Sequence, residues 1–204
     1  MKMNLPNKLT VLRLILVPVF VVVMMISDAL WASAVGLALF VIASFTDMLD
    51  GKIARKYNLV TDFGKFMDPL ADKFMVIGAM LVILYQSMTR EEPNGLFCAI
   101  FFWAVMLVIF RELAVTSIRL VVSGSSGIVI AANMLGKIKT VTQIVALLMA
   151  LLEPAIEYLL CLAFDYPLAG VYPLTILTIV ISTFFTLWSG ISYIWSYRGY
   201  LKQK

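Results

Sequence analysis

Four aspartates in the stretch 47–72 are the residues best suited to chemistry. They form two pairs, spaced three and four residues apart, so on a helix each pair projects from one face. Ionised carboxylates at close quarters repel one another unless cations are present, and hard divalent ions prefer oxygen ligands. The stretch therefore predicts a metal site for two ions, Mg²⁺ or Mn²⁺, with the ligands Asp47, Asp50, Asp68 and Asp72.

Other residues in the same stretch suit a ligand that contains phosphate. Gly51 and Gly64 have no side chain, so a bulky ligand can approach the helix backbone there. Arg55 follows Gly51 by one helical turn and can meet a phosphate in fork geometry. Aspartates paired on a helix can also simply form a face that is exposed to solvent. The apolar sequence on both sides favours a functional site instead, because a charge near the centre of a bilayer costs about 3 kcal/mol or more.

The pattern D-x2-D-G-x2-A-R-x8-G-x3-D-x3-D, with Ala54 as a further fixed position, resembles the signature of the CDP-alcohol phosphotransferases, integral membrane enzymes of phospholipid synthesis. In that family an acceptor hydroxyl attacks the β-phosphorus of a CDP-linked lipid or alcohol, and CMP is released. The resemblance implies that the protein is a homodimer and that Asp72 doubles as general base. It also implies a CDP-lipid site lined by Gly51, Ala54, Arg55 and Gly64.

The residue types agree with phosphoryl transfer without reference to the family. Two metal ions held by carboxylates can stabilise the charge that develops on the entering and leaving oxygens. A carboxylate can also take the proton of an attacking hydroxyl, which matters because the chain has no histidine.

A second group of charged residues follows in two later apolar stretches and comprises Arg111, Arg119, Lys137 and Lys139. Each one alone could be a membrane anchor or a snorkelling side chain. Together they suggest a cavity that binds the phosphate of an anionic acceptor. The segments 4–13, 110–119 and 136–143 resemble the branch of the family that makes phosphatidylglycerol phosphate. That resemblance implies CDP-diacylglycerol as donor and sn-glycerol 3-phosphate as acceptor.

Two other functions stay open at this point. A sister enzyme that uses inositol phosphate or serine would share the aspartate pattern, and only the second charged group speaks against it. A carboxylate-lined transporter of divalent cations is the alternative that is not an enzyme. Transporters usually show repeated halves with broken helices at matching places, whereas this sequence shows one asymmetric site and no repeat.

The composition is that of a protein that crosses the membrane several times. Hydrophobic residues make up 62% of the 204 residues and charged ones 14%, and the mean hydropathy is +0.99. The absence of histidine excludes histidine-ligated metals. The net charge of +4 comes without a basic run interleaved with aromatic residues, so no nucleic-acid partner is expected. Cys98 and Cys161 lie in separate apolar stretches, and we interpret them as buried hydrophobic residues rather than a disulfide.

Membrane helices must position these residues. We expect a single all-α domain over 1–204, in which a short interfacial segment at 1–13 leads into six transmembrane helices. The aspartates then lie at the ends of the second and third spans, and Thr61 is the N-cap of the third. A Ser/Gly-rich break is expected at 123–127. Residues 155–165 either extend the fifth span or form a separate surface helix.

The basic residues predict the orientation. With six spans, every lysine and arginine of the 16 in the chain except Arg90 falls on one side of the membrane. The positive-inside rule makes that side cytosolic. We therefore expect a multi-pass protein of the inner (cytoplasmic) membrane, with both termini and the active site facing the cytosol.

Overall fold

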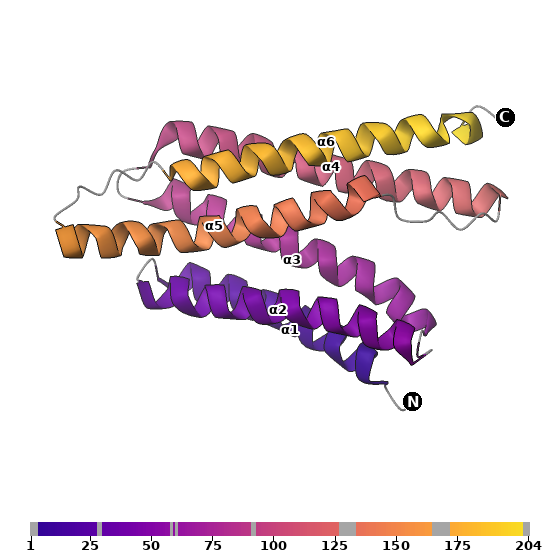
Figure 1. Ribbon diagram of the computed structural model, residues 1–204, viewed down its shortest axis with the longest axis horizontal. Helices are drawn as coiled ribbons and strands as arrows, with labels where there is room; N and C mark the ends of the chain where they lie inside the picture. Colours follow the sequence, from indigo (N-terminus) through magenta and orange to yellow (C-terminus); the bar gives the residue numbers. More distant parts are fainter. Residues whose placement is uncertain are drawn as a thin grey trace.

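The computed structural model describes residues 4–27, 30–57, 59, 61–90, 93–126, 134–164 and 172–201. Within these residues the regular structure consists of α-helices that run alternately up and down one bundle (Figure 1). α1 begins and α6 ends at the same end of the bundle, where α2 also ends and α3 begins. The helices are α1 (Leu5–Ile26), α2 (Leu30–Lys56), α3 (Asp62–Thr89), α4 (Gly95–Ser126), α5 (Met134–Phe164) and α6 (Pro173–Leu201).

Most of these helices can cross a membrane. In the described part of the chain, α1, α2, α4, α5 and α6 each have the necessary length and apolar composition. α3 has 28 residues, enough for roughly 42 Å, but its first half carries several charged side chains, among them Asp68, Asp72 and Lys73. The protein is thus a multi-pass membrane protein, and a sixth span formed by α3 stays a prediction.

α1 separates the two helices that carry the aspartates. It packs along both α2 and α3, whereas α2 and α3 touch each other only slightly. Phe20 and Met24 of α1 are buried together with Phe40 of α2, and the ring centroids of Phe20 and Phe40 are 6.1 Å apart. Met24 fills the space that a side chain at Gly36 would need, since a Cβ there would come 2.3 Å from its Sδ. α1 therefore sets the distance between α2 and α3.

The other half of the bundle is arranged around α6. Both α4 and α5 pack on α6, and α3 packs on both α4 and α5. Among the described residues, α4 and α5 do not pack on each other. The four helices from α3 to α6 therefore frame a space into which side chains from each of them project.

α6 begins at the end of the bundle opposite to the aspartates, and a carboxylate caps it there. Leu174 N and Thr175 N donate to the two carboxylate oxygens of Glu153 at 2.8 and 2.6 Å. The first N–H groups of a helix have no partner within the helix, and a negative charge is favourable beside them. Glu153 on α5 thus fixes the position at which α6 starts.

Two predicted features of the helices are wrong. Residues 5–13 are the first turns of α1 rather than a separate interfacial segment. Pro6 costs no hydrogen bond in the first turn, and nothing breaks the helix after it. α4 continues through Ser126, although a break was expected from residue 123. Serine lowers helix stability by well under 1 kcal/mol per residue and Gly124 lowers it by about 1 kcal/mol relative to alanine, which is too little to end a helix of 32 residues before Ser126.

Other boundaries follow the sequence-based expectations. The hydroxyl of Thr61 accepts a hydrogen bond from Gly64 N at 3.0 Å, so Thr61 is the N-cap of α3 as predicted. α5 runs to Phe164, which decides the open question about the segment 155–165 in favour of an extended helix up to that residue. Residue 127, the last of the predicted break, lies outside the described residues.

Candidate active site

Arg13 of α1 lies at the centre of the aspartate cluster. Its Nη1 is 2.7 Å from Asp47 Oδ1 and 2.6 Å from Asp72 Oδ1, and its Nη2 is 2.5 Å from Asp50 Oδ2. The Arg13 side chain is fully buried. A buried charge is tolerated only when it is paired and hydrogen-bonded. One guanidinium from α1 therefore joins carboxylates from α2 and α3.

The fourth aspartate is also held from α1. Thr10 Oγ1 donates to Asp68 Oδ1 at 2.7 Å. One turn earlier, Asn7 Oδ1 accepts from the hydroxyl of Thr61 at 2.9 Å, which links α1 to the start of α3. Asn7, Thr10 and Arg13 are all buried. Sequence reasoning assigned no role to these three residues. The signal was their spacing of three, which puts three polar side chains on one face of a mostly apolar helix.

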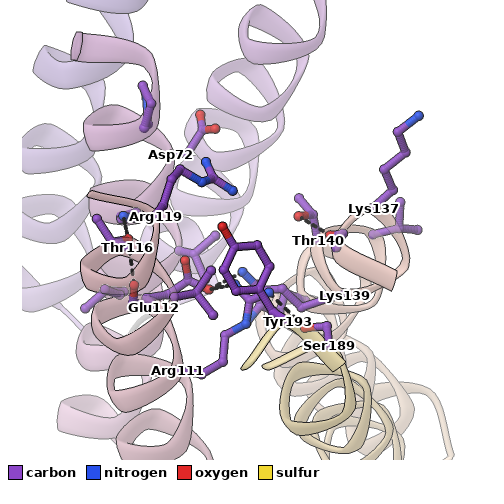
Figure 2. A pocket seen from close by; sticks show the side chains of 18 residues that line it. Asp72, Arg111, Glu112, Thr116, Arg119, Lys137, Lys139, Thr140, Ser189 and Tyr193 are labelled. Carbon is purple, nitrogen blue, oxygen red and sulfur yellow. Dashed lines mark hydrogen bonds and ion pairs between the residues drawn. The ribbon is translucent and has the colours of Figure 1, made fainter. Parts of the chain in front are cut away.

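A basic cavity of about 530 Å³ lies beside this cluster and is framed by α3 to α6 (Figure 2). The structure brings together here all four cations that the sequence predicted for the acceptor site. Lys73, which was not predicted, lines the cavity as well, and its Nζ donates to the hydroxyl of Thr116. Five cations thus face two carboxylates in the lining. These charged residues are Asp72, Lys73, Arg111, Glu112, Arg119, Lys137 and Lys139.

Asp72 belongs to both parts of the site. Its carboxylate contacts Arg13 in the aspartate cluster, and the residue also lines the basic cavity. The side chain is 51% exposed, against 5% for Asp50, so Asp72 can meet a ligand in the cavity. Asp47, Asp50 and Asp68 do not line this cavity. Asp72 is therefore the carboxylate placed to act on a molecule bound among the cations.

Comparisons with known proteins show the family of the chain. A family model described as CDP-alcohol phosphatidyltransferase matches residues 3–188. The chain belongs to this family. A protein of Bacillus subtilis is 40% identical over 202 residues, which cover 93% of each chain. A protein of Salmonella paratyphi A is 36% identical over 205 residues, 98% of this chain and 97% of its own. A protein of Rickettsia felis is 38% identical over 144 residues, 71% of this chain and 72% of its own. All three are named CDP-diacylglycerol–glycerol-3-phosphate 3-phosphatidyltransferase.

The donor set of this CDP-alcohol phosphatidyltransferase fits a hard divalent cation by type. Anionic oxygens from α2 and α3 converge on one guanidinium within 2.5–2.7 Å, so the fold gathers them around a positive charge. Asp68 is close enough to Asp50 for their charges to repel. No three carboxylates in the described part of the chain are spaced as ligands of one metal ion, and the Arg13 guanidinium lies among those of the cluster. The ligand roles stay predictions.

Three of the residues predicted for the CDP-lipid, Gly51, Ala54 and Gly64, do not line the basic cavity. Gly64 is buried, and a Cβ there would come 3.2 Å from Asn7 Oδ1 and 3.3 Å from Thr61 Oγ1. Gly64 therefore permits the close approach of α1 to the first turn of α3. Gly51 and Ala54 are partly exposed on α2, and the side chain of Arg55 lies outside the described part of the structure. A nucleotide site at these residues stays a prediction.

Proposed function

We propose that this protein transfers the phosphatidyl group of CDP-diacylglycerol to sn-glycerol 3-phosphate, giving phosphatidylglycerol phosphate and CMP. The observation that carries the proposal is the position of Asp72, which connects the aspartate cluster with a cavity rich in cations. The names of the relatives, two of which align over nearly the whole chain, support the same reaction.

The residues suit the bond changes of this reaction. A hydroxyl oxygen of the acceptor bonds to the β-phosphorus of the donor, and the bond from that phosphorus to the bridging oxygen of CMP breaks. The proton of the hydroxyl passes to the Asp72 carboxylate, which is the exposed carboxylate next to the cavity. The phosphate of the acceptor is held by charge-assisted contacts with the cations of the basic cavity.

We further propose that Asp47, Asp50, Asp68 and Asp72 hold two ions of Mg²⁺ or Mn²⁺. When bound, these ions would stabilise negative charge on the diphosphate and on the leaving CMP. Gly51, Ala54, Arg55 and Gly64 would line the site of the CDP-lipid. Arg13 supplies a fixed positive charge among the same carboxylates.

The proposed setting is the inner membrane, crossed six times, with both termini and the active site facing the cytosol. Its support is the distribution of lysine and arginine, since Arg90 alone of the 16 falls on the other side in a six-span topology. The donor is a membrane lipid and the acceptor a soluble cytosolic phosphate. We also propose a homodimer, which light scattering of the purified protein in detergent would test.

An assay of CMP release tests the function directly. The purified protein is given CDP-diacylglycerol and Mg²⁺, and the acceptor is varied among glycerol 3-phosphate, inositol phosphate and serine. We expect release only with glycerol 3-phosphate, loss of activity in excess chelator, and little activity in Asp72→Asn. Release with another acceptor would identify a sister enzyme. No release with any acceptor, together with Mn²⁺ uptake into proteoliposomes, would favour the cation transporter.

A further inference from the structure

The cations of the basic cavity differ in how they are held. Glu112 Oε1 accepts from Arg111 Nη1 at 3.0 Å and from Lys139 Nζ, and these three side chains are only 10–12% exposed. Arg119 and Lys137 are exposed and form no ion pair with any described residue. Figure 2 shows Lys137 extended away from the cluster around Glu112. Of the four predicted cations, two thus share one carboxylate and two are not paired within the described residues, while Lys73 donates to the hydroxyl of Thr116.

The paired cations join helices that would otherwise be separate. α4 and α5 do not pack on each other in the described residues, and the contact of Glu112 with Lys139 connects them across the cavity. Arg111 Nη2 donates to Ser189 Oγ of α6 at 2.9 Å. A Cβ at Gly190 would come 3.0 Å from Arg111 Cγ, so the arginine stem lies directly on α6. The three charged residues therefore tie α4, α5 and α6 together.

A bound phosphate would act differently on the two sets. To bind a phosphate fully, Arg111 or Lys139 would have to leave Glu112, and a buried carboxylate would lose one of its two cationic partners. Among the described residues, Arg119 has only a distant cation–π partner, the ring of Tyr193 at 6.0 Å. Arg119 and Lys137 can therefore turn toward a phosphate without breaking an ion pair.

We propose that Glu112 is a positioning residue that divides the cations of the cavity between two tasks. It commits Arg111 and Lys139 to holding the cavity walls, and it leaves Arg119 and Lys137 to bind the phosphate of the acceptor. The proposal rests on the proposed function for the identity of the acceptor. It places specificity for an anionic acceptor in two exposed side chains rather than in four.

The test is a set of single variants and one triple variant, studied in detergent. Arg119→Gln and Lys137→Gln should each raise KM for glycerol 3-phosphate about tenfold or more. Their KM for CDP-diacylglycerol should stay within about twofold of the wild-type value, and Tm should change by no more than about 2 °C. Glu112→Gln should instead lower Tm by roughly 6 °C or more, because it leaves the buried Arg111 and Lys139 without their counter-charge.

The triple variant Arg111→Gln/Glu112→Gln/Lys139→Gln separates wall residues from phosphate ligands. It removes all three charges of the cluster, so we expect it to regain most of the Tm lost in Glu112→Gln and to bind glycerol 3-phosphate with a Kd within about threefold of wild type. A restored Tm with a Kd still raised tenfold would show that Arg111 or Lys139 binds the phosphate, and the proposal would be overturned. Unchanged KM in both Arg119→Gln and Lys137→Gln would overturn it too.

The failure of the proposed function gives a different result. Wild-type protein that releases no CMP with glycerol 3-phosphate would refute the proposed reaction. Titration calorimetry with glycerol 3-phosphate and the Tm series need no turnover, so they would still decide how Glu112 divides the cations. Calorimetry that detects no binding of glycerol 3-phosphate to the wild-type protein would overturn the assignment of Arg119 and Lys137 as phosphate ligands.

Discussion

Replacement of Arg13 by glutamine is the sharpest test of how the aspartate cluster is held together. The side chain is fully buried, and its closest partner Asp50 is 5% exposed. Loss of one partner from such a pair usually costs about 3–5 kcal/mol, because the other charge stays buried without compensation. Asp47 and Asp72 are 32% and 51% exposed, so water screens their ion pairs with Arg13 and these pairs contribute less to stability. We therefore expect Arg13→Gln to lower the free energy of unfolding by about 3 kcal/mol. This loss corresponds to a decrease in Tm of roughly 6–12 °C in a protein of this size.

Thermal unfolding in detergent at a fixed scan rate measures this effect as an apparent Tm. Lys8→Gln is the matched control, because Lys8 is an exposed cation on the same helix, and we expect a change of at most about 2 °C. Arg13→Lys keeps the positive charge but loses the forked donor geometry of the guanidinium group. Its Tm should therefore lie between the Tm of Arg13→Gln and that of Lys8→Gln. The double variant Arg13→Gln/Asp50→Asn should recover part of the loss. If Arg13→Gln unfolds within about 2 °C of wild type, the guanidinium does not hold the cluster.

Three further predictions concern other parts of the site and the fold. Asp72→Asn should lower kcat by roughly 10²–10⁴-fold at any metal concentration. Raised Mg²⁺ should partly restore the activity of Asp47→Asn. If a Mg²⁺ titration of CMP release rescues both variants equally, Asp72 is only a metal ligand and not the general base. Gly64→Leu should lower Tm, because the leucine side chain would meet Asn7, and it should also abolish binding of CDP-diacylglycerol. A variant with normal Tm and normal binding would contradict both expectations. Glu153→Gln should lower the free energy of unfolding by about 1–3 kcal/mol, because it leaves an N–H group of α6 without a partner. We expect kcat to stay at the wild-type value. A lower kcat would show that the two ends of the bundle are coupled.

Local features of the site could be predicted from the sequence. The N-cap at Thr61 depends on residues within one turn, and the pairing of the aspartates depends only on helical spacing. The four cations of the basic cavity were predicted as a group because they recur at the same end of two apolar stretches. What they share is a position along the membrane normal, which hydropathy and charge reveal.

Features that depend on packing could not be predicted in this way. The sequence predicts the aspartates at the ends of the second and third spans, but it does not reveal that α1 lies between these helices and brings Arg13 into the cluster. The pairing of Glu112 with Lys139 joins residues 27 positions apart in the chain, and nothing in either local sequence selects the partner. Gly64 was assigned to ligand access, although its neighbours in space are the polar side chains of α1. In each case the missing information is which helix lies against which.

The position of Arg13 has a consequence for biogenesis. α1 is synthesised before α2 and α3, so the cation of the cluster emerges from the ribosome ahead of the aspartates that it compensates. Each later helix that delivers a carboxylate to the bilayer therefore finds a counter-charge already inserted. A chain with the same helices in a permuted order, with α1 moved to the C-terminus, would have to insert the acidic ends of α2 and α3 uncompensated. The order of the helices along the gene thus favours insertion as much as it serves the finished site.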